Sequence, residues 1–96
     1  MRRDEALRRL RGKRDALRSF DVSRLALFGS VARDTATPGS DVDILVAFER
    51  PVGLFHFIRL KNFLESVLGA HVDLATQEAL DPRLRDEILQ DLVDAA

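Results

Sequence analysis

Two aspartates separated by one residue, Asp41 and Asp43, follow the pair Gly29 and Ser30 after a spacer of ten residues. The aspartates open an apolar run typical of a strand, in which side chains two residues apart point to the same face. Carboxylates held side by side raise each other's pKa unless a cation lies between them. A glycine turn that leads into a helix offers backbone N–H groups to phosphate. The spacing therefore predicts a site for a divalent metal ion and a nucleotide.

A third carboxylate, Asp73, could join this pair. It lies in an expected strand over residues 71–75, where it alternates with Val72 and Leu74. If that strand neighbours the strand of Asp41 and Asp43, three carboxylates meet on one face. Oxygen donors of this kind suit Mg²⁺ or Mn²⁺. Asp41 and Asp43 would bind metal, and Asp73 would bind a second metal and help deprotonate an attacking hydroxyl. This chemistry is nucleotidyl transfer with pyrophosphate as leaving group.

Four further residues are candidates for contacts to the nucleotide phosphates. Gly29 ends the preceding strand in a tight turn, and a short helix is expected from Ser30 to about Asp34, with Ser30 available as its N-cap. Arg33 lies one turn further on and is either a surface charge of the short helix or a contact to phosphate or a carboxylate. Ser40, the last residue of the expected loop over residues 35–40, is either a turn former or a phosphate contact.

Hydrophobic periodicity predicts the elements that position these residues. An amphipathic helix is expected over residues 4–19, although Gly12 weakens it by about 1 kcal/mol relative to alanine. Strands are expected over residues 24–28, 42–48 and 71–75, and a helix over 54–68 that ends at Gly69. In the second strand one face is apolar and should lie against the helices: Val42, Ile44, Val46 and Phe48.

A closing helix should begin after Asp81, because Asp81 is a suitable N-cap and Pro82 fits the first helical position. Its periodicity predicts a buried face made of four residues: Leu84, Ile88, Leu92 and Val93.

Composition favours one small domain that spans residues 1–96, with a basic helix over 1–20 and a catalytic core over 24–96. A content of 46% apolar and 32% charged residues suits a single core, and the lack of cysteine excludes disulfides and thiolate sites. Residues 1–24 carry nine Lys/Arg and four Asp/Glu, a balance of +5, whereas the remainder carries six and twelve, a balance of −6. The basic segment is either a solvated helix face or a patch for an acidic partner. Without an apolar span, the cytoplasm is expected and a membrane is not.

Three stretches of the chain resemble a known family. Residues 27–33 (LFGSVAR), 40–46 (SDVDILV) and 72–74 (VDL) are similar to the minimal nucleotidyltransferase domain of the DNA polymerase β-like superfamily. The resemblance extends roughly from Leu25 to the end of the chain. It implies an α+β nucleotidyltransferase fold, a small mixed sheet with helices packed mainly on one face. Asp34 departs from the pattern, because these proteins often carry glycine after the arginine.

The resemblance also implies a function and a partner. Small members are commonly antitoxins of HEPN-domain ribonuclease toxins, and as protein adenylyltransferases they move AMP from ATP onto a tyrosine of the toxin. A hetero-oligomer and a Mg²⁺-dependent enzyme are therefore expected, and nucleic acid is not expected as a direct substrate. Two alternatives stay open: a non-catalytic antitoxin that acts by binding, and a weaker one, transfer to a small molecule such as an aminoglycoside.

Overall fold

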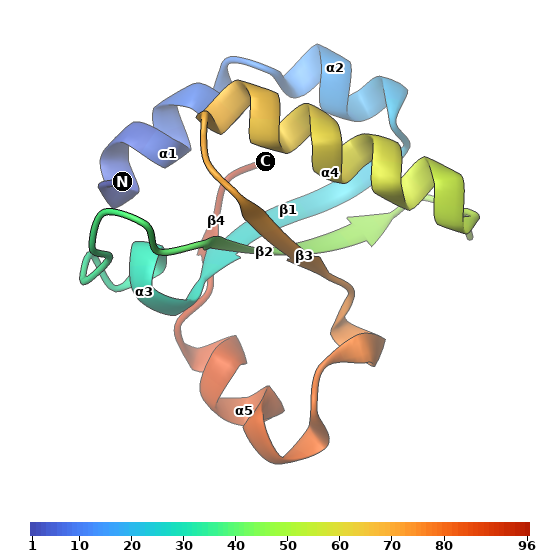
Figure 1. Cartoon of the computed structure of the whole chain (residues 1–96). Coiled ribbons are helices and arrows are strands. Elements are labelled where there is room, and N and C mark those ends of the chain that lie inside the picture. Colours follow the sequence, from blue (N-terminus) through green and yellow to red (C-terminus); the bar gives the residue numbers. More distant parts are fainter.

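The centre of the molecule is a four-stranded mixed β-sheet (Figure 1). The computed structural model describes all residues from Met1 to Ala96. Across the sheet the strands lie in the order β3-β2-β1-β4, and their bounds are β1 Val22–Phe28, β2 Val42–Phe48, β3 Val72–Ala75 and β4 Val93–Asp94. β1 is antiparallel to both of its neighbours, whereas β2 and β3 are parallel. The expected mixed sheet is confirmed, and β4 is an additional edge strand that the sequence did not predict.

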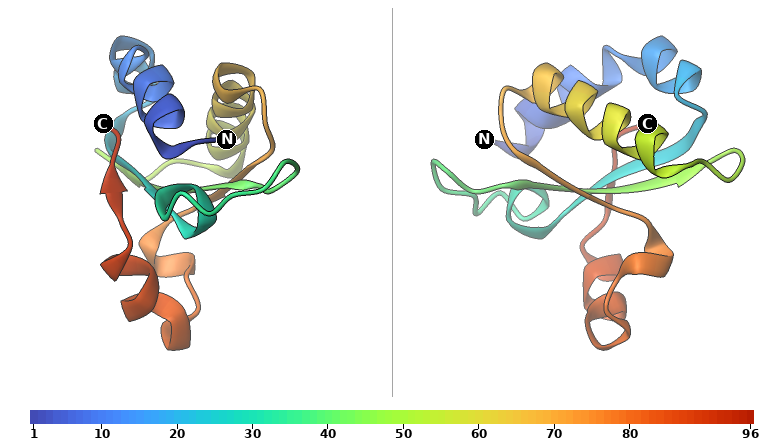
Figure 2. Two further views of the ribbon diagram at one scale, coloured as in Figure 1. Left: turned by 90° about the vertical axis from the view of Figure 1, so that its left-hand side faces the viewer. Right: turned by 45° about the vertical axis from the view of Figure 1, so that its right-hand side comes forward.

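Helices lie mainly on one face of this sheet, as the α+β prediction required (Figures 1 and 2). That face carries α1 (Arg3–Arg11), α2 (Arg14–Ser19) and α4 (Leu54–Leu68). The opposite side carries the 3₁₀ turn η1 (Gln77–Ala79) and α5 (Pro82–Gln90), while α3 (Gly29–Ala32) follows directly on β1. No helix combines the length and apolar character that a bilayer crossing requires.

The alternation in β2 separates two apolar clusters. Three of its side chains belong to the main core, under the helices α1, α2 and α4: Val42, Ile44 and Val46. On the other face Leu45 packs with Phe28 of β1 and with Leu80, near the start of α5. Because Asp43 alternates with the core residues, its side chain lies on this second face. The predicted division of β2 into an apolar and a carboxylate face is confirmed.

The single amino-terminal helix predicted over residues 4–19 is wrong, because the segment forms two helices. α1 ends at Arg11, and α2 begins at Arg14. The backbone N–H of Lys13 donates to the carbonyl of Leu10 at 3.0 Å, a tightened last turn that closes α1. Gly12 sits at this break, where its low helix propensity costs little. The bend allows Leu17 to join the main core beside the buried side chains of α1.

The closing helix begins as predicted, but none of its side chains is fully buried, and of the four residues predicted for its buried face only Ile88 and Leu92 pack, partly buried, against the small cluster around Leu45. The Asp81 side chain accepts a hydrogen bond from the backbone N–H of Arg83 at 2.9 Å, and Pro82 occupies the first helical position. The prediction that Leu84 is buried is wrong, since it is 49% exposed. Val93 lies in β4 rather than in the helix. The helix stops at Gln90, so only its last turns reach the small cluster around Leu45.

The helix α4 offers a direct test of this packing. Leu64 is fully buried in the main core, and truncation to alanine should lower the free energy of unfolding by about 2–5 kcal/mol, because it removes buried surface and leaves a cavity. Leu84→Ala is the matched control and should change stability by only about 0.5 kcal/mol. Urea denaturation of both variants measures the difference. Equal losses would contradict the assignment of Leu64 to the core.

Candidate active site

The sheet brings Asp43 and Asp73 together. β2 and β3 are parallel neighbours, and their register places Asp43 directly opposite Asp73. On the other side of β2, Asp43 lies opposite Phe28, the last residue of β1. Residues opposite each other on neighbouring strands point to the same face. The carboxylates of Asp43 and Asp73 are therefore adjacent. The sequence predicted this on the condition that their strands are neighbours, and that condition is met.

Gly29 makes room for the carboxylate of Asp43. Gly29 has a φ of 69°, a left-handed backbone conformation that residues other than glycine rarely adopt. A Cβ built at this position would lie 3.0 Å from Cγ of Asp43 and would overlap its Oδ2 atom. The glycine is thus required both by the turn and by the close approach of the carboxylate. This contact joins the glycine–serine turn to the aspartate strand in one site.

The environment of Asp43 opposes its ionisation. Burial raises the pKa of Asp43 above its usual value of 3.8, and the charges of Asp73 and Asp41 raise it further. The positive charge of Arg33 lowers it, while a hydrogen bond between the carboxyls of Asp43 and Asp73 again raises it. Asp41 and Asp73 are exposed. An additional cation near these oxygens would relieve the repulsion.

The three carboxylates are close enough to influence one another, but they do not form a finished metal cage. No group of three or more His, Cys, Asp or Glu side chains is arranged so as to hold a metal ion. Asp41 precedes β2 and lies outside the paired register that fixes Asp43 and Asp73.

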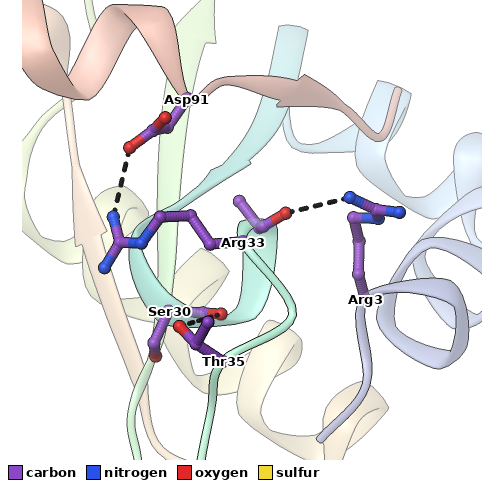
Figure 3. A network of polar contacts seen from close by, with 6 residues as sticks. Arg3, Ser30, Arg33, Thr35 and Asp91 are labelled. Atoms are coloured by element: carbon purple, nitrogen blue, oxygen red, sulfur yellow. Dashed lines mark hydrogen bonds and ion pairs between the residues drawn. The ribbon is translucent and has the colours of Figure 1, made fainter.

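Ser30 has a different local role from the one predicted. The prediction of Ser30 as N-cap is wrong, because α3 begins at Gly29 and its N-cap position is Phe28, without a side-chain hydrogen bond. The helix has only four residues, Gly29–Ala32, so its dipole is small. The carbonyl of Ser30 accepts hydrogen bonds from the backbone N–H and the hydroxyl of Thr35, at 2.8 and 3.4 Å (Figure 3). These bonds fold the following loop back onto the turn.

Arg33 binds a carboxylate in this structure, one of the two partners that the sequence allowed. Its Nη1 atom donates to Oδ2 of Asp91 at 3.1 Å (Figure 3). Asp91 directly follows α5 and lies 58 residues away in sequence. It was not among the predicted site residues, and no local signal could have identified it, because the pairing depends on where α5 is placed.

Ser40 forms a turn, the other role that the sequence left open. Its hydroxyl accepts a hydrogen bond from the backbone N–H of Thr37 at 3.1 Å, and its own N–H donates to the carbonyl of Thr37 at 3.0 Å. This turn precedes Asp41 and sets the entry of the chain into β2. A contact between Ser40 and phosphate stays a prediction.

The backbone conformation at Asp34 explains why glycine fits this position well. Its φ is 62°, in the left-handed region that glycine adopts without cost and that aspartate tolerates better than most residues. Its Oδ1 atom accepts a hydrogen bond from the backbone N–H of Arg3 at 3.0 Å. The Arg3 guanidinium in turn donates to the carbonyl of Ala32 at 3.3 Å (Figure 3). The departure from the family pattern therefore ties the start of α1 to the end of α3.

This mixed sheet in an α+β fold, with paired strand carboxylates beside a glycine turn, is the arrangement expected of nucleotidyltransferases. The sequence profile of the nucleotidyltransferase domain family matches residues 7–95, and the chain belongs to this family. The match extends further toward the amino terminus than the resemblance that began near Leu25. It thus includes part of α1 and all of α2.

Known relatives support this assignment. The chain is 38% identical over 81 residues to the protein adenylyltransferase MntA of Thermococcus cleftensis, which covers 84% of this chain and 82% of that protein. A solved minimal nucleotidyltransferase superposes with a TM-score of 0.82 at 36% identity and covers 97% of this chain and 95% of the other. A Shewanella oneidensis complex of a tri-AMPylated HEPN toxin with an MNT antitoxin matches with a TM-score of 0.65 at 20% identity, over 94% of this chain and 71% of the other, which supports the fold alone.

Proposed function

We propose that this chain is an antitoxin that transfers AMP from ATP to a tyrosine hydroxyl of a HEPN-domain ribonuclease toxin. The observation that carries the proposal is the register of the sheet, which sets Asp43 beside Asp73 and against Gly29. The family membership supports nucleotidyl transfer, and the similarity to a protein adenylyltransferase supports a protein acceptor. The proposal takes its kind of partner from a protein of the same fold, the MNT antitoxin seen in complex with an AMPylated HEPN toxin.

The donor set of the site fits Mg²⁺ or Mn²⁺. All three candidate ligands are carboxylates; burial raises the pKa of Asp43 most, and the charges of Asp73 and Asp41, which raise it further, are ones that a cation would neutralise. Asp41, Asp43 and Asp73 are the residues that would hold the metal. When bound, the metal would stabilise the charge that develops on the phosphates during in-line displacement.

The residues of the chain have distinct roles in this reaction. The tyrosine oxygen forms a bond to the α-phosphorus of ATP, the bond from that phosphorus to the bridging oxygen of the β-phosphate breaks, and pyrophosphate leaves. Asp73 accepts the proton of the hydroxyl, because it lies directly opposite Asp43 in the strand register and its side chain is exposed to an incoming acceptor. Backbone N–H groups at Gly29 and Ser30 would hold the phosphates, since the small α3 dipole adds little.

The transfer can be tested with the purified chain, a candidate HEPN-domain toxin as partner, Mg²⁺ and ATP labelled at the α-phosphate. We expect label on the partner and a mass increase of one or more AMP groups. Asp41→Ala and Asp43→Ala should each lower the rate by at least about 100-fold, because each removes a charge that acts on the reacting phosphates. Asp15→Ala, at an exposed position of α2, is the matched control and should transfer at the normal rate.

Other outcomes identify the alternatives. Neutralisation of the toxin that survives both substitutions would indicate an antitoxin that acts by binding alone. Label that reaches only small molecules would support the alternative of transfer to a small molecule such as an aminoglycoside. Either result would overturn AMP transfer to the partner protein.

A further inference from the structure

A small cleft separates α3 from α5 beside the glycine turn. It has a volume of about 190 Å³ and is lined by six residues: Gly29, Arg33, Leu84, Glu87, Ile88 and Asp91. Because Gly29 also contacts Asp43, the cleft opens next to the carboxylates. Arg33 is the only cation among its lining residues.

Arg33 is held at one point and keeps most of its donors free. The 3.1 Å contact with Asp91 is the one hydrogen bond that its guanidinium makes, and it uses only Nη1. A guanidinium has five N–H donors in a planar fork, so Nε and Nη2 remain available. The Arg33 side chain is 52% exposed, so these donors are open to a ligand. Such a fork suits phosphate oxygens.

Asp91 is itself fixed by the backbone on both sides. Its N–H donates to the carbonyl of Ile88 at 3.1 Å, in the last turn of α5. Two residues later Val93 pairs with Leu27 of β1. The Asp91 side chain is only 33% exposed. A carboxylate anchored in this way can restrict a long arginine side chain that would otherwise sample many rotamers.

We propose that Asp91 is a positioning residue that holds Arg33 over the cleft, with the free edge of its guanidinium directed to the phosphates of ATP. The proposal rests on the nucleotide site of the proposed function and adds a residue from the end of α5 to it. Asp91 does not touch the nucleotide. It acts by limiting the conformations of Arg33 before ATP arrives, which lowers the entropy lost on binding.

Binding of ATP in the presence of Mg²⁺, measured by calorimetry without any acceptor protein, tests this role. Arg33→Ala should weaken ATP binding by about tenfold or more, since it removes a charged hydrogen-bond partner of phosphate. Asp91→Ala should weaken it by about threefold to fivefold, the upper part of the range of a partly exposed ion pair. Asp91→Asn should bind within about threefold of the unsubstituted chain, because its amide oxygen still accepts a hydrogen bond from Nη1.

A double variant separates positioning from a general structural effect. In the Arg33→Ala background, Asp91→Ala should cause no further loss of ATP affinity, because the side chain that it positions is absent. Asp94→Ala is the matched control: it removes the 2.9 Å ion pair with Arg24 in the same carboxyl-terminal segment and should leave ATP affinity unchanged.

Three results would overturn the role of Asp91. These are unchanged affinity in Asp91→Ala, tighter binding in that variant, and an equal loss in the Arg33→Ala background. A chain that binds no ATP at all would instead overturn the proposed function, and with it this extension. The two failures are therefore distinguishable.

Discussion

Asp43→Asn should nearly abolish AMP transfer and, at neutral pH, make the protein more stable. The transfer rate should fall by about 10²–10³-fold, because the substitution removes a charge beside the reacting phosphates. Stability should rise because ionisation of Asp43 is opposed by burial and by two neighbouring carboxylates, which raise its pKa. An amide of the same shape carries no charge and avoids this repulsion. A gain in stability with a loss of activity is typical of a functional residue.

The gain should depend on pH. Asp43 has a higher pKa in the folded chain than in the unfolded one, where it is near 3.8, so the folded state holds the proton more tightly. Below the unfolded pKa both states are protonated and the substitution should have little effect. As pH rises through the raised folded pKa, the unsubstituted chain loses stability relative to Asp43→Asn. At pH 7.5 Asp43→Asn should therefore be the more stable of the two chains.

Urea denaturation at pH 7.5 and near pH 3.5 measures this difference, with Asp86→Asn as control. Asp86 is an exposed aspartate of α5, so its amide should be neutral in both stability and transfer. Addition of Mg²⁺ and ATP should stabilise the unsubstituted chain but not Asp43→Asn, since only a ligand that binds the folded state shifts unfolding. An Asp43→Asn variant that is less stable than the unsubstituted chain at pH 7.5 would contradict the inference that the ionised Asp43 side chain destabilises the fold.

Gly29→Ala should destabilise the fold and disrupt the site. The left-handed backbone costs a residue with a Cβ about 1–2 kcal/mol. The new methyl would overlap Oδ2 of Asp43, and forced overpacking adds about 1–3 kcal/mol. Because Asp43 must move to accommodate the methyl, AMP transfer should fall with stability.

Gly69→Ala is a close control for the backbone cost. Gly69 ends α4 with a φ of 65°, close to that of Gly29, but the nearest atom to an added Cβ is Arg9 Nη1 at 3.9 Å. It should lose about 1–2 kcal/mol of stability and keep its transfer rate. Denaturation and the labelled-ATP assay distinguish the two variants. If they lose equal stability and both keep activity, the contact between Gly29 and Asp43 is not important.

Elements with strong local signals could be predicted with their correct bounds. The strand Val42–Phe48 and the helix Leu54–Leu68 were both predicted at the residues where the structure has them. The strand alternates apolar and other residues, and the helix ends at a glycine with positive φ. By contrast, β4 has two residues and forms only because the chain returns to β1, so no local pattern marks it. The break after α1 falls at Gly12, whose low helix propensity was a local signal, whereas the place of Leu17 in the main core is non-local.

The candidate site shows the same division. The carboxylate pair and the glycine turn could be identified from spacing, whereas the meeting of Asp43 with Asp73 required the order of the strands. The bond from Arg33 to Asp91 spans 58 residues and depends on the position of α5, so the sequence could give only the kind of partner. The sequence predicted that Gly29 binds phosphate. It did not reveal that Gly29 also leaves space for the Asp43 side chain.

That shared space has an evolutionary consequence. The Asp43 side chain fills the space that a side chain at position 29 would occupy. Gly29 and Asp43 therefore form one packing unit, although they come from separate halves of the motif. A change at either position alters the effect of a change at the other. Among descendants of this fold that give up catalysis, the two positions should therefore mutate in concert, and loss of the acid should be what first permits a bulkier residue in the turn.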